Sequence, residues 1–194
     1  MSNSIDDAEL HEIVQRVLQR VMGNSPRETV PSPAPFAPQA QMSERKVVAI
    51  GADHGGFELK EALKPELKTL GFEVDDLGTN GKDAVDYPDF AHAVAQAVGS
   101  GKAWRGIMID GAGIGSCIVA NKVPGVRAGV AYDYSSAVNS REHNDTNVLT
   151  LGAGLIGVNL AKQIVKTWLT TEFAGGRHSP RVDKIKSVEK RYLK

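Results

Sequence analysis

The fold of this chain is indicated above all by one stretch, VVAIGADHGGFELKEALKPELKTL, at residues 47–70. It opens with an apolar run, Val47 to Ile50, that is typical of a buried strand. A glycine-rich turn follows, and then apolar residues that partly keep the period of a helix, at Phe57, Leu59, Leu63 and Leu67. Strand, glycine turn and helix in this order form the repeating unit of parallel α/β sheets.

The same alternation continues toward the end of the chain. Further strands are expected near residues 72–75, 106–109, 128–131 and 148–151. Helices are expected near residues 90–98, 135–141, 158–169 and 183–192. The fold class is therefore α/β, with a parallel sheet covered by helices on both faces. Because ligands of such folds bind at the carboxyl ends of the strands, the loops that follow the strands are the first place to look for a site.

Composition excludes several classes of function. The 194 residues include 23 Lys plus Arg and 23 Asp plus Glu, so the formal net charge is zero and neither nucleic acid nor an anionic membrane is expected as a partner. No apolar run approaches the roughly 18 to 20 residues of a spanning helix, and no secretory signal is recognisable, so we expect a cytoplasmic protein. A single cysteine, Cys117, excludes an intramolecular disulfide and a Cys-based metal site.

The first 43 residues differ in character from the rest. Residues 6–22 carry apolar side chains at helical spacing and acidic ones at their start, which predicts a short amphipathic helix. Residues 23–43 hold five prolines among Ala, Ser and Gln, as in a semi-rigid linker. The domain proper is expected at residues 44–194. The apolar face of the helix could fold back on the domain, pair with another copy, or serve as a docking tag.

Two strand-ending loops carry carboxylates. GADHGG at residues 51–56 places Asp53 and His54 at a helix start, where they could hold an anion and move a proton, or where Asp53 could simply cap the helix. DGAGIGSC at residues 110–117 places Asp110 before a glycine cradle suited to a phosphate or an oxyanion. Its alternative is a structural bond from Asp110 to the turn. Cys117 is expected to be a small buried core residue.

GAGLIG at residues 152–157 matches the dinucleotide-binding pattern G-x-G-x-x-G and follows an expected strand. The acid that should end a second strand about 20 residues later is missing, because Glu172 lies at the close of a helix. These glycines are therefore expected to allow close helix–sheet packing and not to bind a nicotinamide cofactor.

Two further segments are rich in polar groups. SREHNDTN at residues 140–147 places His143 beside Asn144, a combination suited to general acid–base chemistry. GGRHSPR at residues 175–181 places Arg177, Arg181 and the imidazole of His178 at a helix start, where they could bind a phosphate dianion or form an ordinary solvated turn.

Taken together, these segments resemble the type B ribose-5-phosphate isomerases, a family that includes the galactose-6-phosphate isomerase subunits. The matching segments, in order and spacing, are residues 51–57, 86–88, 111–115, 120–122, 141–148 and 175–181. The resemblance implies a five-stranded parallel Rossmann-like sheet in a three-layer α/β/α sandwich, without a metal or an organic cofactor. It also implies a homodimer, with pairing into a tetramer left open, whose two sites lie at the subunit interface.

The implied reaction is aldose–ketose isomerisation of a phosphorylated sugar, ribose 5-phosphate to ribulose 5-phosphate, through an enediolate. By position, His143 would open the furanose ring with help from Asp53. The loop amides and Asn144 would hold the enediolate oxygens, and His54 with two arginines would bind the phosphate. The substrate-binding residues would then be His54, Tyr87, Gly111, Gly113, Gly115, Asn144, Arg177 and Arg181.

The chain departs from the family pattern at two positions. Asp110 stands where the best-known members carry a catalytic Cys, and Ala112 stands where they carry Thr or Ser. An enclosed carboxylate can exchange protons near neutral pH, so Asp110 is expected to be the base, with Cys117 as an alternative. The hydroxyl missing at Ala112 removes a hydrogen bond worth about 0.5–1.5 kcal/mol, which favours a changed substrate preference such as a hexose or deoxy-sugar phosphate. A sugar-phosphate-binding protein without turnover is the remaining alternative.

Residues 6–22 with the linker behind them resemble the encapsulation peptides that carry enzymes into bacterial microcompartments. This resemblance implies that a shell protein is a partner. It also implies that the enzyme works in the lumen of a microcompartment within the cytoplasm.

Overall fold

The computed structural model describes residues 11–17 and 46–193. The chain separates into two compact units, Met1–Gln41 and Met42–Lys194. In the first unit residues 11–17 are helical, and Ile13, Val14 and Val17 are about half exposed. The rest of the helix expected at residues 6–22 and the linker expected at residues 23–43 lie outside the described residues.

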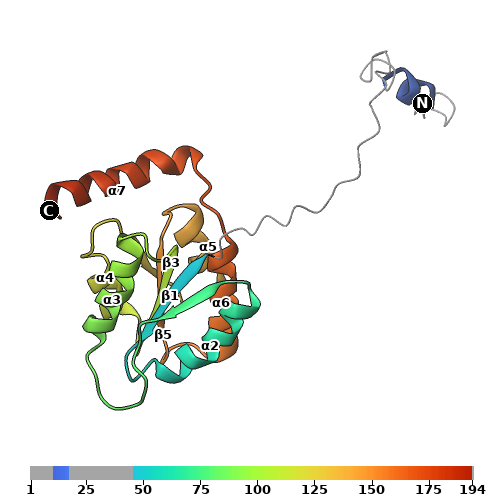
Figure 1. Cartoon of the computed structure of the whole chain (residues 1–194). Helices are drawn as coiled ribbons and strands as arrows, with labels where there is room; N and C mark the ends of the chain where they lie inside the picture. Colours follow the sequence, from blue (N-terminus) through green and yellow to red (C-terminus); the bar gives the residue numbers. More distant parts are fainter. Residues whose placement is uncertain (1–10, 18–45, 194) are drawn as a thin grey trace, which may run out of the picture. The chain divides into compact units, whose positions relative to one another are not determined.

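The second unit is built on a five-stranded parallel sheet (Figure 1). Its strands are β1 (Val47–Ala52), β2 (Glu73–Asp76), β3 (Arg105–Asp110), β4 (Ala128–Val130) and β5 (Val148–Gly152). They lie in the order β2-β1-β3-β5-β4, and every neighbouring pair is parallel. All five strands fall where the apolar runs of the sequence predict them, to within two residues.

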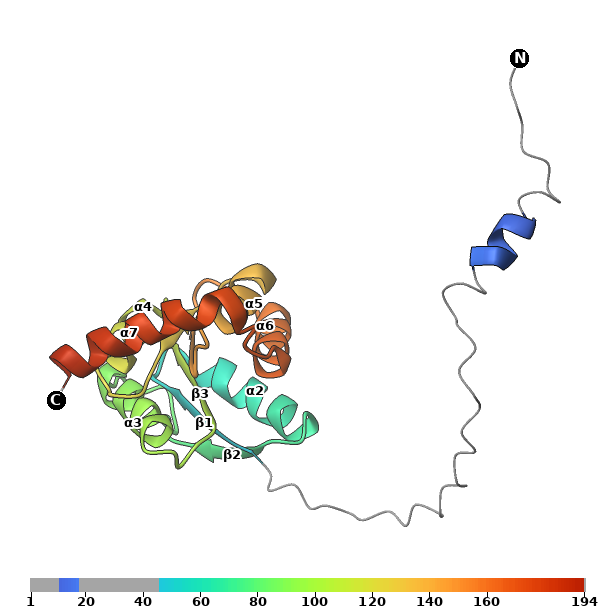
Figure 2. The same cartoon turned by 90° about the horizontal axis from the view of Figure 1, so that it is seen from above.

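Helices cover both faces of this sheet. They are α2 (Phe57–Thr69), α3 (Tyr87–Gly99), α4 (Ile114–Ala120), α5 (Tyr134–Glu142), α6 (Val158–Thr170) and α7 (Ser179–Tyr192). Helices α3 and α4 lie on one face, α2, α5 and α6 on the other, and α7 lies across the end of the sheet where the strands begin (Figure 2). The three-layer α/β/α sandwich implied by the family resemblance is confirmed.

Two helices begin earlier than the sequence predicts. Helix α3 starts at Tyr87 instead of Phe90, and α7 starts at Ser179 instead of Asp183. Both carry a proline within the first two helical positions. Proline is tolerated there because its missing N–H has no partner in the first turn and its fixed φ suits a helix. The prolines therefore open these helices, whereas periodicity alone places the starts after them.

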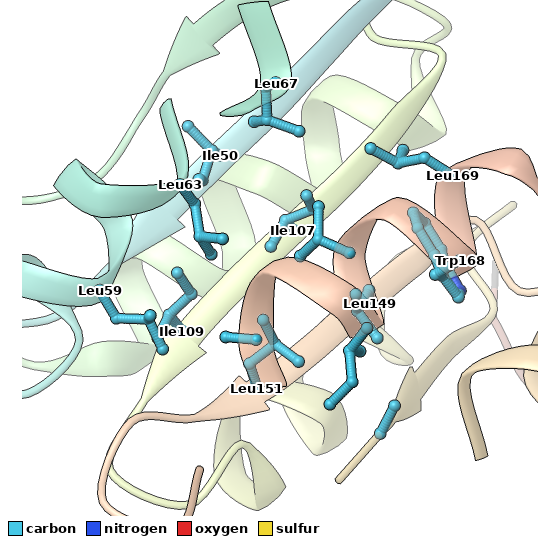
Figure 3. Packing of buried hydrophobic residues seen from close by; sticks show 14 of the residues in the cluster. Ile50, Leu59, Leu63, Leu67, Ile107, Ile109, Leu149, Leu151, Trp168 and Leu169 are labelled. Carbon is cyan, nitrogen blue, oxygen red and sulfur yellow. The ribbon is translucent and has the colours of Figure 1, made fainter. Parts of the chain in front are cut away.

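The larger part of the core lies between the sheet and helices α2 and α6 (Figure 3). Leu59, Leu63 and Leu67 of α2 point toward the alternate residues of β1 and β3. Trp168 of α6 is fully buried and its indole Nε1 donates to Thr146 Oγ1 at 3.0 Å. A second cluster fills the space under α3. Burial on both faces explains why the three central strands, β1, β3 and β5, contain apolar runs without polar alternation.

A buried ion pair between Lys60 and Asp76 holds the end of β2, from which the chain leads toward Tyr87. Lys60 of α2 is fully buried, and its ammonium group donates to both carboxylate oxygens of Asp76, at 2.8 and 2.6 Å. Asp76 also accepts from Lys64 and from the N–H of Gly78. Desolvation opposes ionisation of Asp76, but the bonds from the two lysines outweigh it and lower its pKa.

Candidate active site

Two buried aspartates lie where the adjoining strands β1 and β3 end. Ala52 of β1 pairs with Ile109 of β3, and the N–H of Asp53 donates to the carbonyl of Ile109 at 3.3 Å. Asp53 therefore directly follows β1, and Asp110 is the last residue of the adjoining β3, at the edge of the sheet where such folds bind ligands. Both side chains are less than one tenth exposed.

The carboxylate of Asp110 is bound to its own loop. One oxygen accepts from the N–H groups of Ala112, at 2.8 Å, and Gly113. The other accepts from the N–H of Ser116, at 3.1 Å, and from the Ser116 hydroxyl. Three amides of the glycine cradle thus converge on Asp110 itself. The structural bond that the sequence left as an alternative is present, and the role of Asp110 as base stays a prediction.

The carboxylate of Asp53 accepts fewer hydrogen bonds than that of Asp110. One of its oxygens accepts from the N–H of Gly56 at 3.0 Å, and among the described residues no partner is found for the other. A methyl group on Gly55 would lie 3.3 Å from Asp53 Oδ1 and 3.8 Å from the N–H nitrogen of Gly111. The carboxylate is thus close to the start of the glycine loop. Next to it, His54 is exposed and its Nδ1 lies 3.2–3.3 Å from the backbone of Val85.

Two tyrosines flank the glycine loop. A side chain on Gly115 would overlap the ring of Tyr87, at 2.6 Å, so this glycine allows Tyr87 to lie directly against α4. Tyr132, two residues beyond β4, donates its hydroxyl to the carbonyl of Ala112 at 2.9 Å. The structure therefore gathers Asp53, His54, Tyr87, Asp110, Gly111, Gly113 and Gly115 at one edge of the sheet.

The other expected residues lie at the opposite edge. His143 ends α5 and Asn144 follows it, so both precede β5 and stand where the strands begin. Asn139 Nδ2 lies 2.8 Å from His143 Nδ1, and Asn144 Nδ2 lies 3.2 Å from the carbonyl of Asn139. When the Asn139 amide donates to Nδ1, the neutral ring of His143 carries its proton on Nε2.

His178 belongs to this second group. Its ring stacks on that of His143, with centroids 4.0 Å apart and planes at 9°. Arg177 donates to His178 Nε2 at 3.3 Å, and both Arg177 and Arg181 are exposed. Desolvation, followed by the charges of His143 and the two arginines, lowers the pKa of His178.

Asp145, which follows His143 and Asn144, has a strained backbone and binds two arginines. Asp145 has a φ of 47°, in the left-handed region. Its carboxylate accepts from Arg127 at 2.8 Å and from Arg141 at 2.9 Å, and its carbonyl accepts from Arg127. A cavity of about 640 Å³ opens beside Asn139 and Asn144.

Within one chain, therefore, the expected site is divided between two edges of the sheet. The central strands β1, β3 and β5 have five or six residues, which at about 3.3 Å per residue separates the edges by roughly 15–20 Å. His54 and the arginines Arg177 and Arg181, expected to share one phosphate, are on opposite sides of this gap.

The remaining sequence hypotheses have clear outcomes. Cys117 is only partly buried, so the expectation of a buried core residue is wrong, although burial raises the pKa of its thiol and disfavours the thiolate. Gly152 and Gly154 pack against the 110–113 loop and not, as expected, between helix and sheet: a side chain on Gly152 would lie 2.7 Å from the Ala112 carbonyl, whereas one on Gly157 would meet nothing within 4 Å. Beyond β5 the described residues contain only helices, so the second strand of a nicotinamide site is absent there.

The described ranges contain neither a group of three metal-ligating side chains nor a helix long and apolar enough to cross a membrane. These two findings concern residues 11–17 and 46–193 alone.

A model of the family "Ribose/Galactose Isomerase" matches residues 48–185. This chain belongs to the ribose/galactose isomerase family. It is 47% identical over 146 residues to ribose-5-phosphate isomerase B of Escherichia coli, covering 75% of this chain and 98% of the relative. It is 44% identical over 140 residues to D-erythrulose-4-phosphate isomerase of Pectobacterium atrosepticum, covering 71% and 91%.

Solved structures agree. A ribose-5-phosphate isomerase B from Clostridium thermocellum superimposes with a TM-score of 0.74 at 53% identity, over 75% of this chain and 99% of that one. The likeness therefore spans nearly the whole of these isomerases, and the present chain is an isomerase with an additional N-terminal part.

Two residues of this ribose/galactose isomerase were not singled out from the sequence. They are Ser116, which binds Asp110, and Tyr132, which binds the glycine loop. Tyr132 could have been found, because it follows a strand at the edge where ligands bind. The Ser116 contact, like the stacking of the expected imidazole of His178 on His143, depends on side-chain directions that the pattern does not specify.

Proposed function

We propose that this isomerase interconverts ribose 5-phosphate and ribulose 5-phosphate by moving a proton between C2 and C1 through an enediolate. The observation that carries the proposal is the pair of buried carboxylates, Asp53 and Asp110, at the ends of adjoining strands beside a glycine loop. A carboxylate in a buried site is suited to take up and return a proton. The name of the Escherichia coli relative supports the choice of sugar.

We further propose that the active form is a homodimer in which each site uses both copies. His143, Asn144, Arg177 and Arg181 are too far from Asp53 to reach the same sugar within one chain, so a second copy would have to supply them. Exposed apolar side chains that a dimer could bury are present on α7, at Ile185, Val188 and Tyr192, and on α4, at Ile114 and Ile118.

In this arrangement each polar group has a task. As the C1–oxygen bond of the furanose breaks, the Nε2–H of His143 would protonate the ring oxygen, since Asn139 occupies Nδ1, and the nitrogen would recover the proton that the anomeric hydroxyl gives up as it becomes the C1 carbonyl. The free amides of the glycine loop and Asn144 would hold the enediolate oxygens. His54 and the two arginines would hold the phosphate, because guanidinium groups bind it through paired hydrogen bonds.

A different sugar phosphate is the second candidate, and Ala112 favours it. The position lacks the hydroxyl of the best-known members, and a relative 44% identical is named for a four-carbon substrate, D-erythrulose 4-phosphate. A missing hydrogen bond changes the preference among substrates more readily than it abolishes turnover. Hexose and deoxy-sugar phosphates belong in the same comparison.

We also propose that residues 6–22 direct the enzyme into a bacterial microcompartment by binding a shell protein. The half-exposed Ile13, Val14 and Val17 lie on one side of a helical segment and support docking of an apolar face. The shell protein would supply the groove for that face.

The reaction is tested by incubating the purified protein with ribose 5-phosphate in deuterated water and following ketose formation and label at the exchanging carbon. We expect both. If only other aldose phosphates react, the substrate assignment changes. If the protein binds ribose 5-phosphate but exchanges no proton of any aldose phosphate tested, it is a sugar-phosphate-binding protein without turnover.

Packaging is tested by fusing residues 1–22 to a fluorescent protein in cells that make shell proteins. The fusion is expected to co-localise with the shells, and Val14→Asp is expected to release it, while the matched exposed-position control Glu12→Gln is not. The domain from Ser43 onward should remain folded and active. Unchanged localisation after deletion of residues 1–42 would contradict the docking role.

A further inference from the structure

We infer that Asp53 carries the proton between the two carbons, and that Asp110 is a positioning residue that holds the glycine loop. This inference rests on the proposed isomerase function and assigns the two carboxylates of that site. It differs from the sequence expectation, in which Asp110 is the base and Asp53 assists ring opening.

The first argument is the saturation of Asp110. An ionised carboxylate offers about four lone-pair positions, and the four donors from Ala112, Gly113 and Ser116 use all of them. To accept a proton from carbon, Asp110 would have to give up one of these bonds. Each donor belongs to the loop or to the first turn of α4, so that step would loosen the structure that surrounds the sugar.

The second argument is the availability of Asp53. Its only bond among the described residues is to the N–H of Gly56, through Oδ1. The second oxygen can take up a proton while the turn stays intact. Gly55 and Gly111 carry no side chains between this carboxylate and the glycine loop, so their backbones leave space beside it.

The third argument is that the loop is fixed from both sides. Asp110 binds its N–H groups, and the hydroxyl of Tyr132 binds the Ala112 carbonyl at 2.9 Å. The backbone is also bound to the turn after β5, where Ala153 N–H donates to Asp110 O at 2.8 Å and Gly154 N–H donates to Gly111 O at 3.0 Å. Such a loop is preorganised, so the N–H groups that Asp110 does not use are held in place, and preorganised donors are worth more to a developing oxyanion than mobile ones.

The proton transfer balances with Asp53 alone. The C2–H bond of the open aldose breaks, its proton passes to Asp53, and the C1 carbonyl pair moves to O1 as the enediolate forms. Asp53 then returns the proton to C1 while C2 becomes the carbonyl, and the O2 hydroxyl proton passes to O1. Neither an oxidant nor a second reactant is needed.

The decisive experiment measures deuterium exchange and ribose 5-phosphate binding in two isosteric variants. Asp53→Asn retains the oxygen that accepts from Gly56, so we expect it to bind the sugar but to lose about 10²- to 10⁴-fold in exchange. Asp110→Asn retains an oxygen that accepts from the N–H groups of Ala112 and Gly113, but it places an NH2 group against the N–H of Ser116. We therefore expect weaker sugar binding and about a tenfold loss in exchange. The reverse order of losses, with binding intact, would overturn the assignment.

The variant Ser116→Ala tests whether Asp110 is the base even if Asp110→Asn does not fold. It removes one donor from Asp110, and a carboxylate that loses a donor binds protons more readily. If Asp110 were the base, the acidic limb of the kcat/KM profile would move to higher pH. We expect this limb to stay in place while kcat/KM falls a few-fold. Absence of exchange in the unmodified protein with every aldose phosphate would instead remove the proposed function.

Discussion

The imidazole rings of His143 and His178 lie face to face, 4.0 Å apart at their centroids and 9° from parallel. The stack joins the end of α5 to the turn before α7, two segments distant in sequence. Two charged rings at this separation would repel each other, and His178 is also desolvated beside Arg177 and Arg181. The pair is therefore stable when His178 is neutral.

This stack predicts a loss of stability in mild acid. The folded chain holds the pKa of His178 below its unfolded value of about 6.5, so the unfolded chain takes up the proton first as the pH falls. The contribution is complete above about pH 6.5 and is lost as the pH falls toward the lower folded pKa. His178→Phe keeps an aromatic ring against His143 but cannot titrate. Thermal denaturation between about pH 7.5 and 5.5 should show a larger fall in Tm for the unmodified protein. Equal falls would contradict the prediction.

The left-handed backbone of Asp145 predicts an order among its variants. Asp145→Ala removes the carboxylate that binds Arg127 and Arg141 and also places an ordinary side chain at a φ of 47°. Asp145→Gly removes the same carboxylate without the conformational cost. We expect both variants to be less stable than the unmodified protein, and the glycine variant to exceed the alanine variant by about 1 kcal/mol in free energy of unfolding. Urea unfolding at matched protein concentration measures the difference, and an alanine variant as stable as the glycine variant would argue against strain at this residue.

The buried Lys60 predicts a destabilisation that a second change reverses. Asp76→Ala leaves the ammonium group buried with Glu61 as its remaining ion-pair partner, and we expect a loss of about 3 kcal/mol in the free energy of unfolding. Adding Lys60→Met removes the buried charge and should restore most of the loss. Urea unfolding of both variants provides the measurement. A double variant less stable than the single one would show that packing, not charge, decides this position.

The fold was accessible from the sequence because the three central strands β1, β3 and β5 are buried on both faces. Val48, Ile50, Ile107 and Ile109 are fully buried, so their strands appear as apolar runs bounded by glycine or polar loops. The first residues of the helices were harder to predict. A proline such as Pro88 can either follow the end of a helix or stand in its first turn, and only the packing of α3 against the sheet shows that it opens a helix here.

The residues of the candidate site could be predicted from the sequence, but their arrangement in space could not. The rule that ligands bind at strand ends singled out Asp53 and Asp110 correctly as neighbours. It could not show that Asp110 turns back onto its own loop amides, because that depends on the side-chain direction and not on spacing. Nor could it show that His143 stands at the other edge of the sheet, although its position before β5 implies this once the strands are parallel.

The division of the site predicts that two inactive variants restore each other. Asp53→Asn and His143→Asn remove residues from opposite edges of the sheet. In a mixed dimer with composite sites, one site carries both changes and the other carries none. Random pairing of equal amounts should therefore recover about a quarter of the unmodified activity, because half of the dimers are mixed and each has one intact site. Activity is measured after the two proteins are refolded together.

The matched control pairs Asp53→Asn with Asp110→Asn, two changes at the same edge. Every site in that mixed dimer keeps one defect, so its activity should not exceed the mean of the two variants. Recovery with His143→Asn but not with Asp110→Asn can arise only if the two edges that meet at one sugar belong to different copies. If neither mixture recovers activity although mixed dimers have formed, His143 does not act across the interface, and the wide separation of His143 from Asp53 would then exclude it from the reaction.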